Sequence, residues 1–326
     1  MEGFSFSDKI FCFNPSAEEG KYRNKTVYHY TSPAGLIAIL RTPSIRFTDC
    51  EYLNDKSEYK HIHIPLEKAF EAVRDRLYNS ELPEMIENYI NDKYDYSEII
   101  TEKPGLGLNG MKSLNMRHFV FCASTDKDSL NMWNYYVKGG NYQGYSIGIS
   151  VKDMINDLSV RIGKNVKLFY GQVIYQDKEK IETLKSIITK VDLDLHNALQ
   201  QHKNTEDYDL ITQEHYRELL SYIENYRLFF KDSAFLGEKE YRFVFRLPDN
   251  QDLNLNGGLS ICYDMKQGIM TPYCDISFDK TNTIKKIIIS PMLETQLAKS
   301  GLERFLKDNG YNPKVDIDNS KIPIRY

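Results

Sequence analysis

A histidine between a short β-prone segment and a helical segment is the first residue whose type and position could do chemistry. His29 lies near the end of a β-prone run over 26–30, and Thr31 or Ser32 can cap the next helix, with Pro33 suited to its first position. The N-terminus of a helix gathers backbone N–H groups and positive dipole, which suit a phosphate or a ribose hydroxyl. His29 could therefore contact a nucleotide, or it could only tie the strand to the following loop.

Two glutamates and an arginine alternate along a second β-prone segment. On a regular strand Glu238, Glu240 and Arg242 would share one face, and Lys239 would share the buried face with the aromatic residues at 241, 243 and 245. Carboxylates at the mouth of a strand could hold a sugar hydroxyl. The alternative is a surface ion pair of little energetic value.

An aromatic pair follows the β-prone segment 118–123. Trp133 and Tyr136 are three residues apart, so they would lie on one face of a short helix. This face could pack on the sheet, or it could stack on a planar ring such as nicotinamide or a base.

A polar cluster after residue 53 has two interpretations. Asn54 and Asp55 indicate a turn, and Asp55 with Glu58 would form a pair like a capping box. The alternative is that these side chains hold a ribose or a metal, although three oxygen ligands alone are weak evidence for a metal site.

The elements that must position these residues are mixed in order. We expect strands over 26–30, 44–48, 118–123, 142–150, 166–175, 240–247, 284–290 and 314–317, and helices over 64–78, 82–90, 178–201, 212–230 and 293–309. Strands and helices do not alternate regularly, which disfavours a doubly wound parallel sheet. The order predicts an α+β fold with a mixed, mostly antiparallel sheet. We expect one domain over 1–326, with helical insertions at about 60–115 and 176–232.

Composition limits the classes of function. The chain has 326 residues, 41% hydrophobic and 27% charged, with a net charge of -4, so it lacks the global basic field of a nonspecific duplex binder. Five widely spaced cysteines without a CxxC pair favour neither a zinc site nor a disulfide framework. We find no signal peptide and no membrane-spanning run, and we expect a cytoplasmic protein.

Five clusters follow one another along the chain: His29–Ser32, Asn54–Glu58, Met132–Tyr136, Glu238–Arg242 and Ser320–Pro323. In this order they resemble an uncharacterised bacterial family, the domain of unknown function 2971. A more distant similarity is to ADP-ribosyltransferases of the His-Tyr-Glu type, with a departure at Tyr30, where many such enzymes have glycine.

The more distant similarity implies roles for individual residues. His29 would orient the nicotinamide ribose, Tyr136 or Trp133 would stack on the nicotinamide ring, and Glu240 would stabilise the developing positive charge. Arg242 would position Glu240 or a phosphate. The implied catalytic residues are His29, Glu240 and Tyr136, and the implied NAD-binding residues are Tyr30, Thr31, Asn54, Trp133, Glu238 and Arg242.

The same similarity implies an enzyme that consumes NAD as a substrate and needs no metal. The acceptor could be a protein, a nucleic acid or water, and a toxin or phage-defence effector with a regulatory partner protein would fit this activity. A second hypothesis is a nucleotide-sensing or protein-binding module without catalysis. A third is a metal-dependent nuclease that uses Asp55, Glu58, Glu238 and Glu240.

Overall fold

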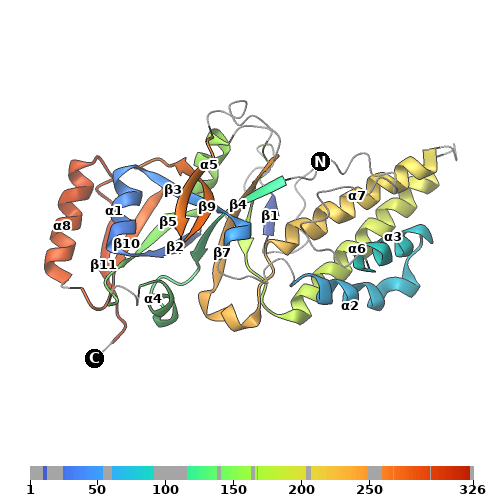
Figure 1. Cartoon of the computed structure of the whole chain (residues 1–326), viewed down its shortest axis with the longest axis horizontal. Helices are drawn as coiled ribbons and strands as arrows, with labels where there is room; N and C mark the ends of the chain where they lie inside the picture. The colour runs from blue at the N-terminus through green and yellow to red at the C-terminus, as the bar shows by residue number, and fades with distance from the viewer. Residues whose placement is uncertain are drawn as a thin grey trace.

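A mixed sheet and a bundle of long helices lie at opposite ends of the molecule (Figure 1). The structure is a computed structural model, and it describes residues 10–12, 25–53, 61–91, 116–137, 141–162, 166, 168–202, 207–248, 259–266, 268–293 and 295–323. The predicted Asn54, Asp55 and Glu58 cluster lies outside these described residues.

In the part of the chain that is described, eleven strands form one sheet. Its main path runs β1-β6-β7-β4-β2-β5-β10-β11, and β3, β9 and β8 branch from β4. The pairings are antiparallel except for the parallel pair β10–β11, which confirms the predicted α+β class with a mixed, mostly antiparallel sheet. The strands are β1 (Ile10–Cys12), β2 (Thr26–Thr31), β3 (Ser44–Asp49), β4 (Met116–Ser124), β5 (Tyr145–Ser150), β6 (Leu168–Gln172), β7 (Glu240–Pro248), β8 (Cys262–Lys266), β9 (Ile269–Ser277), β10 (Ile284–Ile289) and β11 (Asp316–Asn319).

One edge of β4 is divided between two strands. Its other edge pairs with β7 along the whole strand, from Met116 to Ser124. On the divided edge, β2 pairs through Tyr28 with Ser124, and β3 pairs through Thr48 and Asp49 with residues 120 and 119. Residues 121–123 lie between these two contacts. We call this arrangement the sheet fork.

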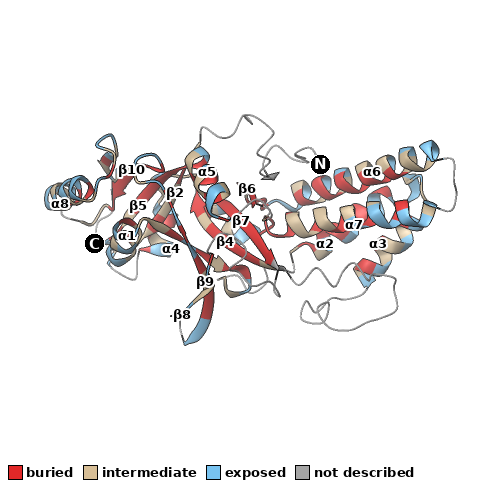
Figure 2. Ribbon diagram, turned by 90° about the horizontal axis from the view of Figure 1, so that it is seen from above, coloured by how far each residue is buried: buried red, intermediate tan, exposed pale blue. Residues whose placement is uncertain are grey.

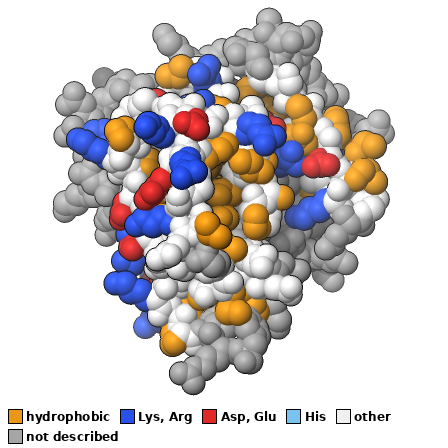
Figure 3. Space-filling model, turned by 90° about the vertical axis from the view of Figure 1, so that its left-hand side faces the viewer, with side chains coloured by type: hydrophobic (Ala, Val, Ile, Leu, Met, Phe, Trp, Pro, Cys, Tyr) orange, Lys and Arg blue, Asp and Glu red, His pale blue; other side chains and the backbone are white. Residues whose placement is uncertain are grey.

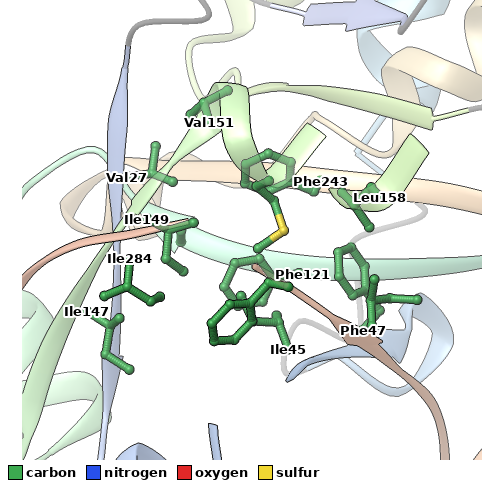
Figure 4. Close-up of a cluster of buried hydrophobic side chains, with 14 of the residues drawn as sticks. Val27, Ile45, Phe47, Phe121, Ile147, Ile149, Val151, Leu158, Phe243 and Ile284 are labelled. Carbon is green, nitrogen blue, oxygen red and sulfur yellow. The ribbon is translucent and has the colours of Figure 1, made fainter. Parts of the chain in front are cut away.

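Both faces of the central strands are buried. On β7, Phe243 belongs to a core that also contains Phe47, Phe121 and Leu158, all packed around the same side of the sheet (Figure 4). The next residue, Val244, belongs to a second core on the opposite face. A strand that is buried on both faces is favoured by a continuous apolar run, as in residues 243–245.

Helices cover the two faces. The second core extends into the bundle of α2 (His63–Val73), α3 (Glu81–Asn91), α6 (Asp177–Gln201) and α7 (Tyr208–Arg227), whose inward faces are buried (Figure 2). No helix in the described ranges is long and apolar enough to cross a membrane. The remaining α-helices are α1 (Pro33–Arg41), α4 (Leu130–Tyr136), α5 (Val151–Arg161) and α8 (Thr295–Asp308).

The predictions from the sequence missed several helices and strands. Helix α5 starts directly where β5 ends, and Ser150 caps it by accepting a 3.3 Å hydrogen bond from the N–H of Asp153, so no turn marks the change. Strands β8 and β9 were also missed, because Pro272 interrupts the apolar pattern and four of the five β8 residues are exposed. Strand β6 is shorter than the predicted strand 166–175.

Truncating the central core residue should destabilise the fold. We expect Phe243→Ala to lower the free energy of unfolding by about 3–5 kcal/mol, because it leaves a cavity in a fully buried position. Urea unfolding followed by circular dichroism measures this. Val160→Ala is the control, since Val160 is 76% exposed, and it should change stability by less than about 0.5 kcal/mol. Equal effects of the two substitutions would contradict the assigned core.

Candidate active site

A cavity of about 150 Å³ lies at the sheet fork. Segments that are far apart in the sequence supply its walls, and three of them are the forked strands β2, β3 and β4. Five residues with predicted roles in catalysis or ligand binding are part of its lining, and Tyr30 is one of them. The lining residues are Tyr28, His29, Tyr30, Arg46, Thr48, Leu53, Val120, Phe121, Cys122, Ala123, Met132, Tyr136, Glu238 and Glu240.

His29 bridges the open edge of the fork. Its Nδ1 lies 3.1 Å from the carbonyl oxygen of Cys122, and its ring lies against Phe121 with 5.0 Å between the ring centroids. Because a carbonyl can only accept, Nδ1 carries the proton in the neutral ring and Nε2 keeps its lone pair. Burial lowers the pKa of His29, and the hydrogen bond to Cys122 opposes this shift only in part. The ring is therefore neutral near pH 7.

Two carboxylates and two cations form a buried cluster beside the cavity. Lys231 Nζ donates to Glu238 Oε2 at 2.6 Å and to Glu240 Oε2 at 2.9 Å. Arg242 holds Glu240 from the other side, with Nε 2.9 Å from Oε1 and Nη2 3.0 Å from Oε2. All four side chains are buried. Both oxygens of Glu240 are thus occupied by cationic donors.

The charges within this cluster keep Glu240 and Lys231 ionised. Burial alone would raise the pKa of Glu240, but Arg242 and then Lys231 outweigh burial and lower this pKa to about 2. Burial alone would lower the pKa of Lys231, but Glu240 and Glu238 raise it above its usual value. The pair Glu240 and Lys231 is therefore charged at neutral pH.

A kink in the backbone brings the two glutamates to the same lysine. Glu238 ends a 3-10 helix, η7 (Ser233–Glu238), and Glu240 begins β7. Between them Lys239 has a φ of 43°, in the left-handed region. Lys239 consequently points to the surface and pairs with Asp126 at 3.1 Å, so the prediction that it shares the buried aromatic face was wrong.

Tyr136 forms part of the cavity rim. Its hydroxyl donates to Glu238 Oε1 at 3.3 Å, while 41% of the residue is exposed. Burial of the hydroxyl and the charges of Glu238 and Glu240 raise the pKa of Tyr136. The hydroxyl therefore stays protonated, and the ring offers a flat wall to a ligand.

Trp133 has a different place from the one predicted. It is fully buried, it does not line the cavity, and its Nε1 donates to Asp128 Oδ1 at 2.8 Å. Its ring meets the Tyr30 ring edge-on, with 4.7 Å between centroids. The stacking role predicted for Trp133 is therefore wrong in this structure, because the indole packs inside the protein.

Tyr30 also has a structural role. Its hydroxyl donates to the carbonyl of Asp126 and accepts from the N–H of Ser129, both at 2.9 Å. These bonds anchor the loop before α4 on β2. Tyr30 also lines the cavity, although only 4% of the residue is exposed.

Two further predicted NAD contacts do not line the cavity. Thr31 is at the end of β2, where it pairs with Tyr145 of β5. Arg242 lies behind Glu240 and donates from Nη1 to the carbonyl of Leu228 at 2.6 Å. Arg242 therefore holds Glu240 and does not line the cavity.

The C-terminal cluster is tied to α4 through Asp128. Ser320 Oγ donates to Asp128 Oδ1 at 2.6 Å, and the N–H of Lys321 donates to Oδ2 at 2.7 Å. Since Asp128 Oδ1 also accepts from Trp133, one carboxylate joins the start of α4 to the C-terminal segment. The Ser320–Pro323 cluster thus has a structural role at α4.

Sequence reasoning missed Lys231 and Arg46. Lys231 directly follows the buried hydrophobic run Leu228–Phe230. A lysine directly after such a run was the feature of the sequence that could have indicated a buried cation. Arg46 alternates with two core residues of β3 and lines the cavity. In the ranges described, no group of three or more histidine, cysteine or acidic side chains could hold a metal ion.

Removing the shared cation should destabilise the protein. We expect Lys231→Met to lower the free energy of unfolding by about 3 kcal/mol, because two buried carboxylates lose a partner. Urea unfolding at pH 7 measures this. The control Lys185→Met breaks a more exposed pair with Glu182 and should cost less than about 1 kcal/mol. A stability of Lys231→Met equal to wild type would rule out the described cluster.

Low pH should lower the free energy of unfolding, partly because Glu240 becomes protonated. Its folded pKa is depressed to about 2 from 4.5, so its contribution is complete above pH 4.5 and is lost as pH falls toward 2. We expect Glu240→Gln to be less stable than wild type at pH 7 by at most about 3 kcal/mol, and the difference to shrink below pH 4.5. Urea unfolding at a series of pH values tests this. A difference that is independent of pH would contradict the assigned shift.

Comparison with known proteins gives a match to one family model and no activity. No curated protein and no solved structure matched the chain. One family model matched, and its range begins at Met132 of α4 and ends at Phe243 of β7. The matched region thus includes Tyr136, Lys231, Glu238 and Glu240, whereas His29 lies before it. Residues 132–243 match the model of the family described as "Protein of unknown function (DUF2971)".

Proposed function

We propose that the cavity binds the nicotinamide-ribose end of NAD and that the protein cleaves the bond between nicotinamide and ribose. The observation that supports this proposal is the convergence of His29, Tyr136, Glu238 and Glu240 on one cavity. These residues come from β2, α4, η7 and β7, so their proximity is a property of the tertiary fold.

The size and lining of the cavity suit one charged ring. Its volume of about 150 Å³ is below the roughly 300–1,000 Å³ of pockets that enclose a whole ligand. It would therefore hold the nicotinamide and part of the ribose, with the rest of the dinucleotide outside. Aromatic walls from Tyr28, Phe121 and Tyr136, next to two carboxylates, favour a ring that carries positive charge.

The proposed reaction is a substitution at the ribose carbon that bears nicotinamide. The C–N bond breaks and its electron pair stays on the nicotinamide nitrogen, which becomes neutral. An oxygen or nitrogen nucleophile forms the new bond to carbon and gives its proton to solvent. The acceptor is a protein, a nucleic acid or water. We place this activity in the cytoplasm, because the spacing of the cysteines in the sequence favours no disulfide framework.

The contacts suggest different tasks for the two glutamates. Glu238 Oε1 receives a 3.3 Å hydrogen bond from Tyr136, which leaves capacity to accept from a ribose hydroxyl. Glu240 is held at both oxygens, so it positions Lys231 and adds negative charge near the ring. The unprotonated Nε2 of His29 could accept from a second hydroxyl.

A non-catalytic nucleotide-binding module is the second candidate. It is favoured by the pairing of both Glu240 oxygens with cations, because Arg242 and Lys231 offset the charge that would stabilise a cationic transition state. The metal-dependent nuclease hypothesis is not developed further, since Asp55 and Glu58 lie outside the described residues.

Nicotinamide release from millimolar NAD tests the proposed enzyme. We expect release by the wild-type chain, in the presence of protein, nucleic acid or water as acceptors, and about 100-fold slower release by Glu238→Gln. Glu182→Gln is the control, because Glu182 is exposed on α6 and should leave the rate unchanged. Circular dichroism verifies that the variants are folded.

Two other outcomes distinguish the candidates. Binding of NAD in calorimetry without nicotinamide release would support the non-catalytic module. Absence of both binding and release at millimolar NAD would overturn both candidates.

A further inference from the structure

Arg46 is a cation on the cavity wall to which the proposed chemistry assigns no task. Its neighbours on β3, Ile45 and Phe47, are fully buried in the sheet core. Because side chains alternate along a strand, Arg46 and Thr48 project from the opposite face, and both line the cavity. Arg46 is thus directed toward the cavity by the same alternation that buries its neighbours.

The guanidinium of Arg46 is held in a fixed orientation and is accessible. It lies over the ring of Tyr273, with 3.6 Å from Cζ to the ring centroid. Its Nη1 is 2.6 Å from Asp264 Oδ2, and its Nε is 3.7 Å from Asp275 Oδ1. The side chains of Arg46 and Asp264 are 46% and 56% exposed. A stacked guanidinium presents its N–H groups edge-on, which suits bidentate contacts with carboxylate or phosphate oxygens.

The present partner of Arg46 can be displaced. Asp264 belongs to β8, which pairs with β9 at the border of the described sheet and is mostly exposed. Exposed ion pairs contribute little to stability, so exchanging Asp264 for another anion has a small cost. A diphosphate carries more charge and more acceptor oxygens than one carboxylate, and it would compete well for the same donors.

The remaining polar groups of the cavity cannot bind an anion well. His29 is neutral, and the charges of Lys231 and Arg242 are taken up by Glu238 and Glu240. Among the described residues that line the cavity, the residue with a cationic side chain is Arg46. A ligand with both a ring and phosphates would therefore place its phosphates toward Arg46.

We propose that Arg46 binds the phosphate groups of a nucleotide ligand, and that Asp264 occupies this site while the ligand is absent. The inference rests on the proposed function for the identity of the nucleotide, NAD. It also applies to a nucleotide-binding protein without catalysis, because both need a partner for the phosphates.

Calorimetric titration with inorganic pyrophosphate tests the site directly. We expect Arg46→Ala to weaken pyrophosphate binding about tenfold, since a charge-assisted bidentate contact is lost. Arg46→Lys should bind with intermediate affinity, because it keeps the charge without the planar fork. Asp264→Asn should bind pyrophosphate about twofold to threefold more tightly, since it removes the competing anion.

Matched controls come from the α8 end of the molecule, where Lys and Arg side chains spread over the surface (Figure 3). Arg304→Ala removes an exposed positive charge from α8, and Asp316→Asn removes an exposed aspartate that pairs with Lys286. Neither residue lines the cavity, so both variants should bind pyrophosphate like wild type.

Three results of the pyrophosphate titration would overturn the inference. They are wild-type affinity in Arg46→Ala, no pyrophosphate binding by the wild-type chain, and an equal gain of affinity in Asp264→Asn and Asp316→Asn, which would be a general charge effect. The proposed enzyme can fail separately: Arg46-dependent pyrophosphate binding without nicotinamide release would leave the phosphate site intact. Conversely, nicotinamide release with an unchanged KM for NAD in Arg46→Ala would reject the phosphate site alone.

Discussion

The division of one edge of β4 between two strands is the constraint on which the cavity depends. β2 pairs with Ser124 at the end of that edge and β3 pairs with residues 119 and 120 near its middle, so residues 121–123 lie between the two strand pairings. In this segment a side chain supplies a hydrogen bond to the backbone, because the ring of His29 donates to the carbonyl of Cys122. The fork persists because β2 and β3 are each paired along their length with another strand, β5 and β9 respectively.

The buried ion cluster connects the helical bundle to this fork. The segment that leaves α7 supplies the carbonyl of Leu228 to Arg242 and the ammonium of Lys231 to both glutamates. Two negative and two positive side chains balance formally, which allows four charged groups to be buried together. The end of the bundle is thus part of the site, and its packing sets where Glu238 and Glu240 lie.

Patterns in the sequence predicted the parts of the site that are set by residues close to one another along the chain. The placement of His29 on a short strand that leads into a helix, the aromatic helix with Tyr136 and the start of β7 at Glu240 were all readable from spacing. The burial of Trp133 was not, because it depends on Asp128 and the distant Ser320. The pairing of Lys231 with both glutamates was hidden for a similar reason, since it requires the left-handed residue Lys239 and the path of the chain after α7.

The fork also has a consequence for how the chain folds. β2 precedes β4 and β5 in the sequence, yet it must be placed between them, and the contact of His29 with Cys122 spans 93 residues. Contacts of such long range form slowly, because a large loop must be closed first. Until β2 is inserted, the edge of β4 is open to pairing with other chains. The strand edge that provides the cavity in the native protein is therefore an aggregation-prone edge during synthesis.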